Sequence, residues 1–192
     1  MNNGVALTAQ KNTGQYSSTY PWISGIITTE GKFSLPTSSA WYVQVKAKMP
    51  DVSQGMWPAL WFLRGPSGSP DNEFDAYEGG WLGTHVNQIM HTDFFAGQGQ
   101  VQNAYDTGTD LTTAYHIYAV KFVPNTSITV YLDGKQVWQV LASQGYTISA
   151  EPYQIMLQLQ VTASGASGWH TTANSSTPKS SMQIAEMQAY TP

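Results

Sequence analysis

The sequence predicts an all-β fold, a sandwich of antiparallel sheets. Several short segments alternate between apolar and polar residues, the pattern of strands with one buried face. Turn residues separate these segments, a spacing typical of sandwiches and barrels. Asp133-Gly134, a favoured two-residue hairpin turn, joins two of them. With 192 residues, 41% of them hydrophobic, and no internal repeat, residues 1–192 are predicted to form a single domain with a sizeable core.

The composition excludes several classes of partner. A net charge of −4 argues against a nucleic acid, and no apolar run approaches the length of a transmembrane helix. The chain has no cysteine, so disulfides say nothing of its redox compartment. The start, Met1–Gly4, lacks the basic and apolar regions of a signal peptide. We therefore expect no nucleic-acid partner and no membrane span.

The first half of the chain alternates most clearly in Trp41–Met49, where the odd-numbered residues are expected to face the core. A turn is expected around Glu30-Gly31, and Pro58 predicts a local irregularity because proline lacks a backbone N–H. The strands expected in this half are Val5–Leu7, Ile23–Ile27, Lys32–Leu35, Trp41–Met49 and Met56–Leu63.

The second half has two polar stretches with little periodicity, residues 96–114 and 162–181, both predicted as long loops. In Tyr153–Val161 the apolar face alternates with a face that carries Gln158 and Gln160. This amide row suits either a cleft that binds hydroxyl groups or a solvated sheet face. The strands expected here are Val86–Phe95, Tyr115–Phe122, Ser127–Leu132, Lys135–Leu141, Tyr153–Val161 and Met182–Tyr190.

Three of the chain's 12 acidic residues fall within Glu73–Glu78, between apolar and aromatic flanks. The segment is typical of a strand, ended by Gly79-Gly80, so Glu73 and Asp75 share one face. A regular strand would place Glu78 on the other face. A β-bulge near Ala76 and Tyr77 would bring all three acids onto one face, and bulges occur next to active sites.

Three converging carboxylates repel one another unless one of them holds a proton, and such sharing lets two carboxyl groups take different roles at one pH. A pair about 5–5.5 Å apart suits glycoside hydrolysis with retention of configuration. A calcium site or a structural hydrogen-bonded cluster would use the same residue types, so the spacing alone leaves both interpretations open.

The surrounding motifs extend this pattern. The acid run Glu73-Phe74-Asp75-Ala76-Tyr77-Glu78 has the form Glu-x-Asp-x-x-Glu, and with its neighbours it resembles glycoside hydrolase family 16 from about Ser24 to Tyr190. The resemblance implies a curved antiparallel jelly roll, concanavalin-like, with a cleft on its concave sheet. The matching segments are Gly31–Phe33, Val45–Pro50, Gly55–Trp61, His116–Val120 and Val130–Lys135.

The resemblance also implies an endo-acting, retaining β-glycosidase without a cofactor. Glu73 would be the nucleophile, Glu78 the acid/base, and Asp75 would orient Glu73 by a hydrogen bond. The substrate would be a polysaccharide of the β-1,3-glucan or galactan type. The few Lys and Arg residues, eight in all, disfavour heavily sulfated polymers.

Several further residues are candidates for substrate binding. Trp57 and Trp61 match tryptophans that line the family's cleft, although both could instead belong to the core. His91 matches a histidine near the acid/base, or is structural. The full set is Trp57, Trp61, Arg64, Trp81, His91, Gln158, Gln160 and Trp169.

No metal site is expected. The family often places a calcium-binding Asp near the start of its last strand, where this chain has Ala185, and His85, His116 and His170 are too scattered for a metal site. Residues Ala166–Trp169 only approximate the family's Gly-Gly-x-Trp pattern.

A polysaccharide hydrolase works outside the cell, so an extracellular, cell-surface or virion-associated location is expected, as a monomer or as part of a larger extracellular or virion protein. Two alternatives remain: a non-catalytic carbohydrate-binding or adhesin domain on the same fold, and a structural sandwich within a larger assembly. The intact acid motif favours the enzyme. The sequence leaves the exact polysaccharide and the oligomeric state open.

Overall fold

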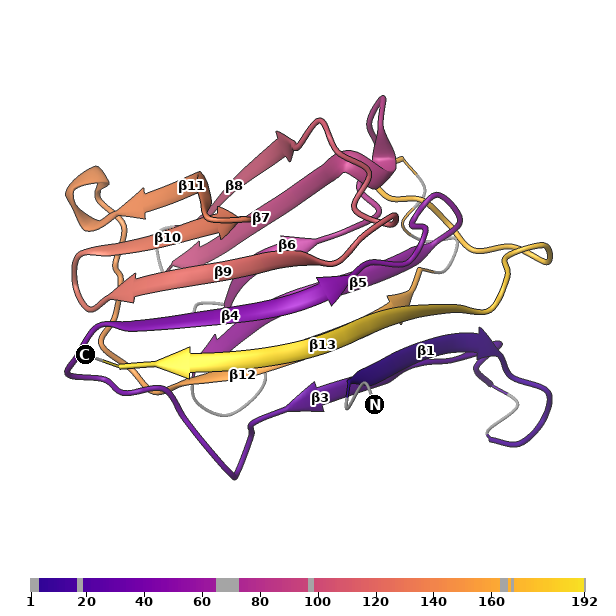
Figure 1. Cartoon of the computed structure of the whole chain (residues 1–192), viewed down its shortest axis with the longest axis horizontal. Helices are drawn as coiled ribbons and strands as arrows, with labels where there is room; N and C mark the ends of the chain where they lie inside the picture. Colours follow the sequence, from indigo (N-terminus) through magenta and orange to yellow (C-terminus); the bar gives the residue numbers. More distant parts are fainter. Residues whose placement is uncertain are drawn as a thin grey trace.

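The computed structural model shows two antiparallel β-sheets stacked as layers (Figure 1). The structure describes residues 4–16, 19–64, 73–96, 99–162, 166 and 168–191. Within these residues one sheet has seven strands and the other has six. The predicted antiparallel all-β sandwich is therefore confirmed.

The seven-stranded sheet is built from both ends and the middle of the chain. In spatial order its strands are β11 (Lys135–Leu141), β10 (Ser127–Leu132), β9 (His116–Val123), β4 (Trp41–Lys48), β13 (Ser180–Tyr190), β1 (Val5–Lys11) and β2 (Trp22–Ile23).

The six-stranded sheet carries the acid motif on β6, between β5 and β7. In spatial order its strands are β3 (Gly25–Thr28), β12 (Tyr153–Val161), β5 (Met56–Arg64), β6 (Glu73–Glu78), β7 (Ile89–Ala96) and β8 (Gly99–Asp106).

The core lies between the sheets because each strand turns one apolar face inward. On β4 the odd-numbered residues from Trp41 to Ala47 are buried, as predicted. Trp41 stacks between Phe62 of the six-stranded sheet and Phe122 of its own sheet, with ring centroids 5.5 Å and 4.8 Å away. Each such buried side chain stabilises the fold by about 1.5–3 kcal/mol relative to exposure. The opposite face of the six-stranded sheet is left free for the acids.

Two predicted elements were wrong, and a third, Ile23–Ile27, is divided between β2 and β3, which belong to different sheets. Lys32–Leu35 is not a strand: the N–H groups of Lys32 and Phe33 both donate to the Thr29 carbonyl, and this turn ends the sheet pairing. The predicted loop 96–114 contains β8, which pairs with β7 along Ile89–Ala96. Only alternate residues of β8 are half-buried, so its polar composition hid the strand.

Strand β7 begins later than predicted, because Val86–Gln88 forms a turn of 3-10 helix. The hairpin between β10 and β11 is confirmed, with Asp133 at φ +49° and Gly134 at φ +79°, as a two-residue primed turn requires. The helices in the described part of the chain fall short of the length and hydrophobicity that crossing a bilayer requires.

Candidate active site

The predicted bulge lies on β6. Across the sheet, Leu60 of β5 faces Tyr77 and the next residue, Trp61, faces Asp75, so Ala76 has no opposing residue. The pairing with β7 shifts by one residue at the same place, between Asp75 and Glu78. Ala76 and Tyr77 both point into the core, and Glu78 returns to the face of the other two acids.

The three acids lie where two hollows meet on this face. The β5–β12 hollow has a volume of about 250 Å³. The β7–β8 hollow has a volume of about 260 Å³. The residues shared by both are Trp57, Glu73, Asp75 and Glu78. The β5–β12 hollow adds Ala59, Trp61, Gln158 and Gln160, and the β7–β8 hollow adds Trp81, Asp93, Phe95, Gln100 and Trp169.

Both carboxylate oxygens of Glu78 have a polar partner. The Trp57 indole N–H donates to Oε1 at 2.9 Å, and Nδ1 of His91 lies 3.2 Å from Oε2. His91 Nε2 lies 3.0 Å from Oε1 of Gln102 on β8. Because that amide oxygen only accepts, Nε2 carries a hydrogen and Nδ1 faces Glu78. His91 thus bridges Glu78 of β6 and Gln102 of β8.

Asp75 is the carboxyl group that holds a proton. Burial, and then the charges of Glu78 and Glu73, raise its pKa well above the usual range. Burial first, then Glu78, also raises the pKa of Glu73, whereas a hydrogen bond from Asp75 lowers it. The hydrogen bond between the two groups therefore favours the proton on Asp75 and the charge on Glu73.

Asp93 of β7 is a fourth acid that the sequence analysis did not select. Burial raises its pKa to about 6, against the effect of a hydrogen bond from Gln100. Asp93 stands two residues after His91, so alternation along the expected strand puts both on one face, and a signal existed. Gln100 and Gln102 gave no signal, because they fall in the stretch that was predicted as a loop.

Aromatic rings wall the β7–β8 hollow. Trp169 lies 5.3 Å from Trp57 and 4.9 Å from Trp81, measured between ring centroids, and Trp81 stacks on His91 at 3.6 Å. His170, also missed, packs against Trp57 at 4.6 Å. These contacts place three of the predicted tryptophans around one space.

The Gly79-Gly80 turn lets Trp81 approach this wall. His170 Nε2 donates to the Gly79 carbonyl at 2.9 Å. Gly80 has φ +96°, and a Cβ there would lie 2.3 Å from the His170 ring, so only glycine fits. Trp81 then pairs with His170 in a single β-bridge.

Of the remaining predicted site residues, three line a hollow and one does not. Trp61, Gln158 and Gln160 line the β5–β12 hollow, and the indole N–H of Trp61 is buried without a partner among the described residues. Arg64, at the end of β5, is not among the described residues that line either hollow; it pairs across the sheet with Tyr153.

One group of side chains has a spacing that could hold a cation. Ligand atoms of Glu78, His91 and Asp93 lie within 4.8 Å of one another. The oxygens of Glu78 already contact Trp57 and His91, which accounts for this grouping without an ion. The expected absence of a metal stays a prediction.

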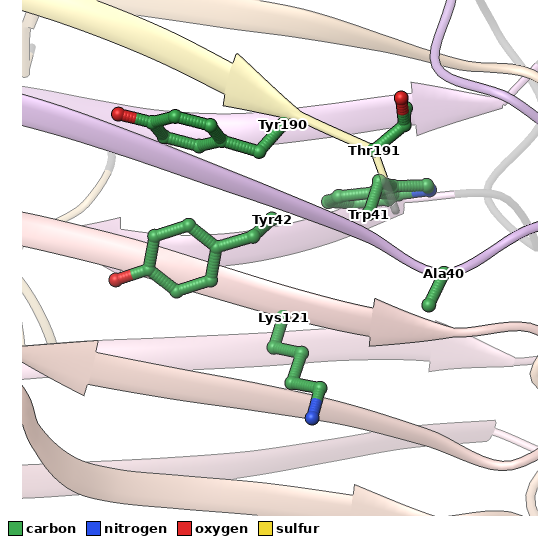
Figure 2. A pocket seen from close by; sticks show the side chains of 6 residues that line it. All are labelled: Ala40, Trp41, Tyr42, Lys121, Tyr190 and Thr191. Atoms are coloured by element: carbon green, nitrogen blue, oxygen red, sulfur yellow. The ribbon is translucent and has the colours of Figure 1, made fainter.

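A third hollow lies on the other sheet and carries no carboxyl group. Figure 2 shows Tyr42, Lys121 and Tyr190 projecting around it, and its volume is about 330 Å³. Its remaining lining residues are Ala40, Trp41 and Thr191. Despite its larger volume, this hollow offers no pair of acid and base, so the chemistry belongs to the acids of β6.

Comparison with known proteins agrees with this geometry. A family model described as glycosyl hydrolases family 16 matches residues 1–184. The glucan endo-1,3-beta-glucosidase A1 of Niallia circulans is 29% identical over 187 residues, a match that covers 87% of this chain and 26% of that protein. The chain spans between 10% and 43% of the length of the curated relatives it matches.

Solved structures show the same fold. The endo-beta-1,3-glucanase of Pyrococcus furiosus matches with a TM-score of 0.79 and 23% identity, over 100% of this chain and 76% of that one. The laminarinase catalytic domain of Thermotoga maritima matches with a TM-score of 0.78 and 23% identity, over 99% and 78% of the two chains. The predicted jelly roll is thus confirmed. Because the family model covers almost the whole chain, the protein belongs to glycosyl hydrolases family 16.

Proposed function

We propose that this protein is an endo-acting, retaining β-glycosidase that cleaves a β-1,3-glucan-type polysaccharide. The observation that carries the proposal is the bulge at Ala76, which places Glu73 and Glu78 on one face with the protonated Asp75 between them. A carbohydrate-binding module does not need two carboxyl groups in different protonation states, whereas glycoside hydrolysis with retention requires them.

In the first step, the Glu73 carboxylate attacks the anomeric carbon and forms a glycosyl ester. The C–O bond to the departing sugar breaks, and Glu78 gives its proton to that oxygen. The hydrogen bond from Asp75 keeps Glu73 charged and aimed before attack. The Trp57 indole stabilises the Glu78 carboxylate that the proton transfer leaves behind.

In the second step, Glu78 takes a proton from water, and the water oxygen attacks the anomeric carbon on the face opposite Glu73. The ester bond breaks, Glu73 returns to its charged form, and the sugar keeps its β configuration. His91, held by Gln102, lies on the oxygen of Glu78 that is not bonded to Trp57, so it steadies the same carboxyl group in both steps.

The two hollows support internal cleavage. They lie on opposite sides of β6 and share its three acids, so sugar units can bind on both sides of the broken bond. The Niallia circulans relative is a glucan endo-1,3-beta-glucosidase, which supports a β-1,3-glucan as substrate. A polymer of this kind lies outside cells, so we keep an extracellular site of action as part of the proposal.

The proposal is tested by following a polysaccharide panel with NMR, using the wild type, Glu73→Gln and Glu78→Gln. We expect the β-anomer to appear first from a β-1,3-glucan and both variants to abolish its release. An α-anomer as first product would overturn the retaining mechanism. Binding without cleavage by the wild type would move the function to a carbohydrate-binding module.

A further inference from the structure

Asp93 is a buried carboxyl group that the Glu-x-Asp-x-x-Glu motif does not include. It is 2% exposed and lies opposite Asp75 on the neighbouring strand. A buried charge is costly unless it is paired. No Lys or Arg is among the described residues that line the two hollows. A charged Asp93 therefore destabilises the fold.

The hydrogen bonds of Asp93 are incomplete. Gln100 donates to Oδ2, whereas Oδ1 is buried and has no partner among the described residues. Buried acceptors in folded proteins almost always have a donor. The side chain lines the β7–β8 hollow, so a donor that enters this hollow can complete the set.

The rest of the hollow indicates what that donor is. Trp81 and Trp169 form its aromatic wall, with ring centroids 4.9 Å apart. Apolar rings beside a few polar groups are typical of sites that bind small ligands, and a sugar offers both C–H faces and hydroxyl donors. An anionic sugar would instead bring its charge beside Asp93 and Glu78, with no Lys or Arg among the described lining residues to offset it.

We infer that Asp93 accepts a hydrogen bond from a hydroxyl group of a sugar unit bound in the β7–β8 hollow, and that this sugar must be neutral. The inference rests on the proposed function, because it assigns a specificity-determining residue to the same cleft. It adds a substrate class: glycans whose unit at this position bears neither sulfate nor carboxylate.

Binding is measured by calorimetry in the Glu73→Gln background, which separates it from cleavage. The probes are a neutral β-1,3-glucan hexasaccharide and its sulfated derivative. Asp93→Leu removes the acceptor and the charge, whereas Asp93→Asn keeps an acceptor oxygen. Asp106→Asn, on the same sheet but outside both hollows, is the matched control.

We expect Asp93→Leu to weaken binding of the neutral hexasaccharide roughly ten- to a hundredfold, the effect of one hydrogen bond to a charged group. The affinity of Asp93→Asn for the neutral hexasaccharide should lie between those of Asp93→Leu and the parent. In both variants the affinities for the neutral and the sulfated probe should differ less than they do in the parent. Asp106→Asn should change neither quantity. A merely structural role would not move the preference.

Unchanged affinity and preference in Asp93→Leu would overturn the inference while the proposed function stands, if the wild type cleaves the neutral polymer. Binding without cleavage by the wild type would refute the proposed function, and the Asp93 variants would still test the inference. If the neutral probe does not bind at all, the inference is wrong. Thermal unfolding of each variant checks that it is folded.

Discussion

Asp75 and Asp93 face each other across β6 and β7, with exposures of 5% and 2%. The two carboxyl groups have different hydrogen-bond partners. Asp75 donates a hydrogen bond to Glu73, whereas Asp93 accepts one from Gln100 and lines the β7–β8 hollow with its other oxygen unpaired among the described residues. Both residues therefore affect the stability of the sheet and the chemistry of the site.

Asp93→Asn should stabilise the fold at neutral pH. Burial raises the pKa of Asp93 from 3.8 to about 6, so the folded chain binds this proton more tightly than the unfolded chain. The resulting benefit is present at low pH and is lost as the pH rises through 6. The penalty above pH 6 is about 1–3 kcal/mol.

The measurement is thermal unfolding of the wild type and Asp93→Asn at several pH values. The gain in Tm for the variant should be roughly 2–10 °C near pH 7.5 and should shrink toward pH 4. Asp106→Asn serves as control, since the side chain of this exposed acid bonds to His85 and to its own turn among the described residues. An equal gain at both pH values would contradict the role of burial.

Asp75 should tolerate Asn better than Ala. An Asn side chain still offers an N–H to Glu73, so the nucleophile keeps its hydrogen bond, whereas Ala removes it. Losing one donor of this kind typically lowers kcat about 10²–10³-fold. We expect that loss for Asp75→Ala and a clearly smaller loss for Asp75→Asn. Equal losses in kcat would show that Asp75 acts through its charge instead.

The sequence predicted the parts of the fold that rest on local pattern. The alternation of β4, β5 and β12, the turn at Asp133-Gly134 and the bulge at Ala76 follow from side-chain period, turn chemistry and the need to gather three acids. The strand β8 could not be found this way, because Gln100 and Gln102 are polar and only long-range pairing with β7 makes the segment a strand.

The sequence likewise predicted some residues of the site and missed others. Its acids carry a motif, and the four tryptophans are conspicuous in the sequence. Arg64 is equally noticeable but does not line the hollows, because alternation along β5 puts it on the face of Leu60 and Phe62 rather than on that of Trp61. Residues that act through a partner, such as Gln102 and His170, have no pattern of their own and become visible only through their contacts.

Deleting Ala76 should leave the fold and the faces of the acids intact. Without Ala76, Trp61 faces Asp75 and Leu60 faces Tyr77 as before, and the strand alternates regularly up to Glu78. The carboxyl groups would move relative to each other, and a misplacement of about 1 Å can cost about 10²-fold in rate. We expect a folded variant with weak activity that still depends on Glu73.

Hydrolysis of the β-1,3-glucan and circular dichroism measure these two properties. Deleting Ala76 together with Tyr77 is the contrasting variant, because it turns Glu78 toward the core and should abolish activity. If the single deletion also turns Glu78 inward, its activity will equal that of Glu78→Gln, and the proposed geometry of the bulge is then wrong.

Gln102→Leu should lower kcat and leave KM nearly unchanged. Gln102 accepts the Nε2 hydrogen of His91 and so keeps Nδ1 directed at Glu78. Leu cannot accept, so the imidazole ring of His91 loses the partner that orients it against Glu78. The carboxyl group of Glu78 stays in the cleft, and the binding surfaces for the sugar are untouched.

Removing a partner that orients a functional histidine typically lowers activity about 10–100-fold, and we expect kcat to fall by about that factor. Kinetics on the β-1,3-glucan over a range of substrate concentrations measures kcat and KM separately and checks the loss. Gln102→Glu, which keeps the acceptor, should recover part of the activity. Gln136→Leu, an exposed change on β11 of the other sheet, is the control. A loss confined to KM would instead assign Gln102 to substrate binding.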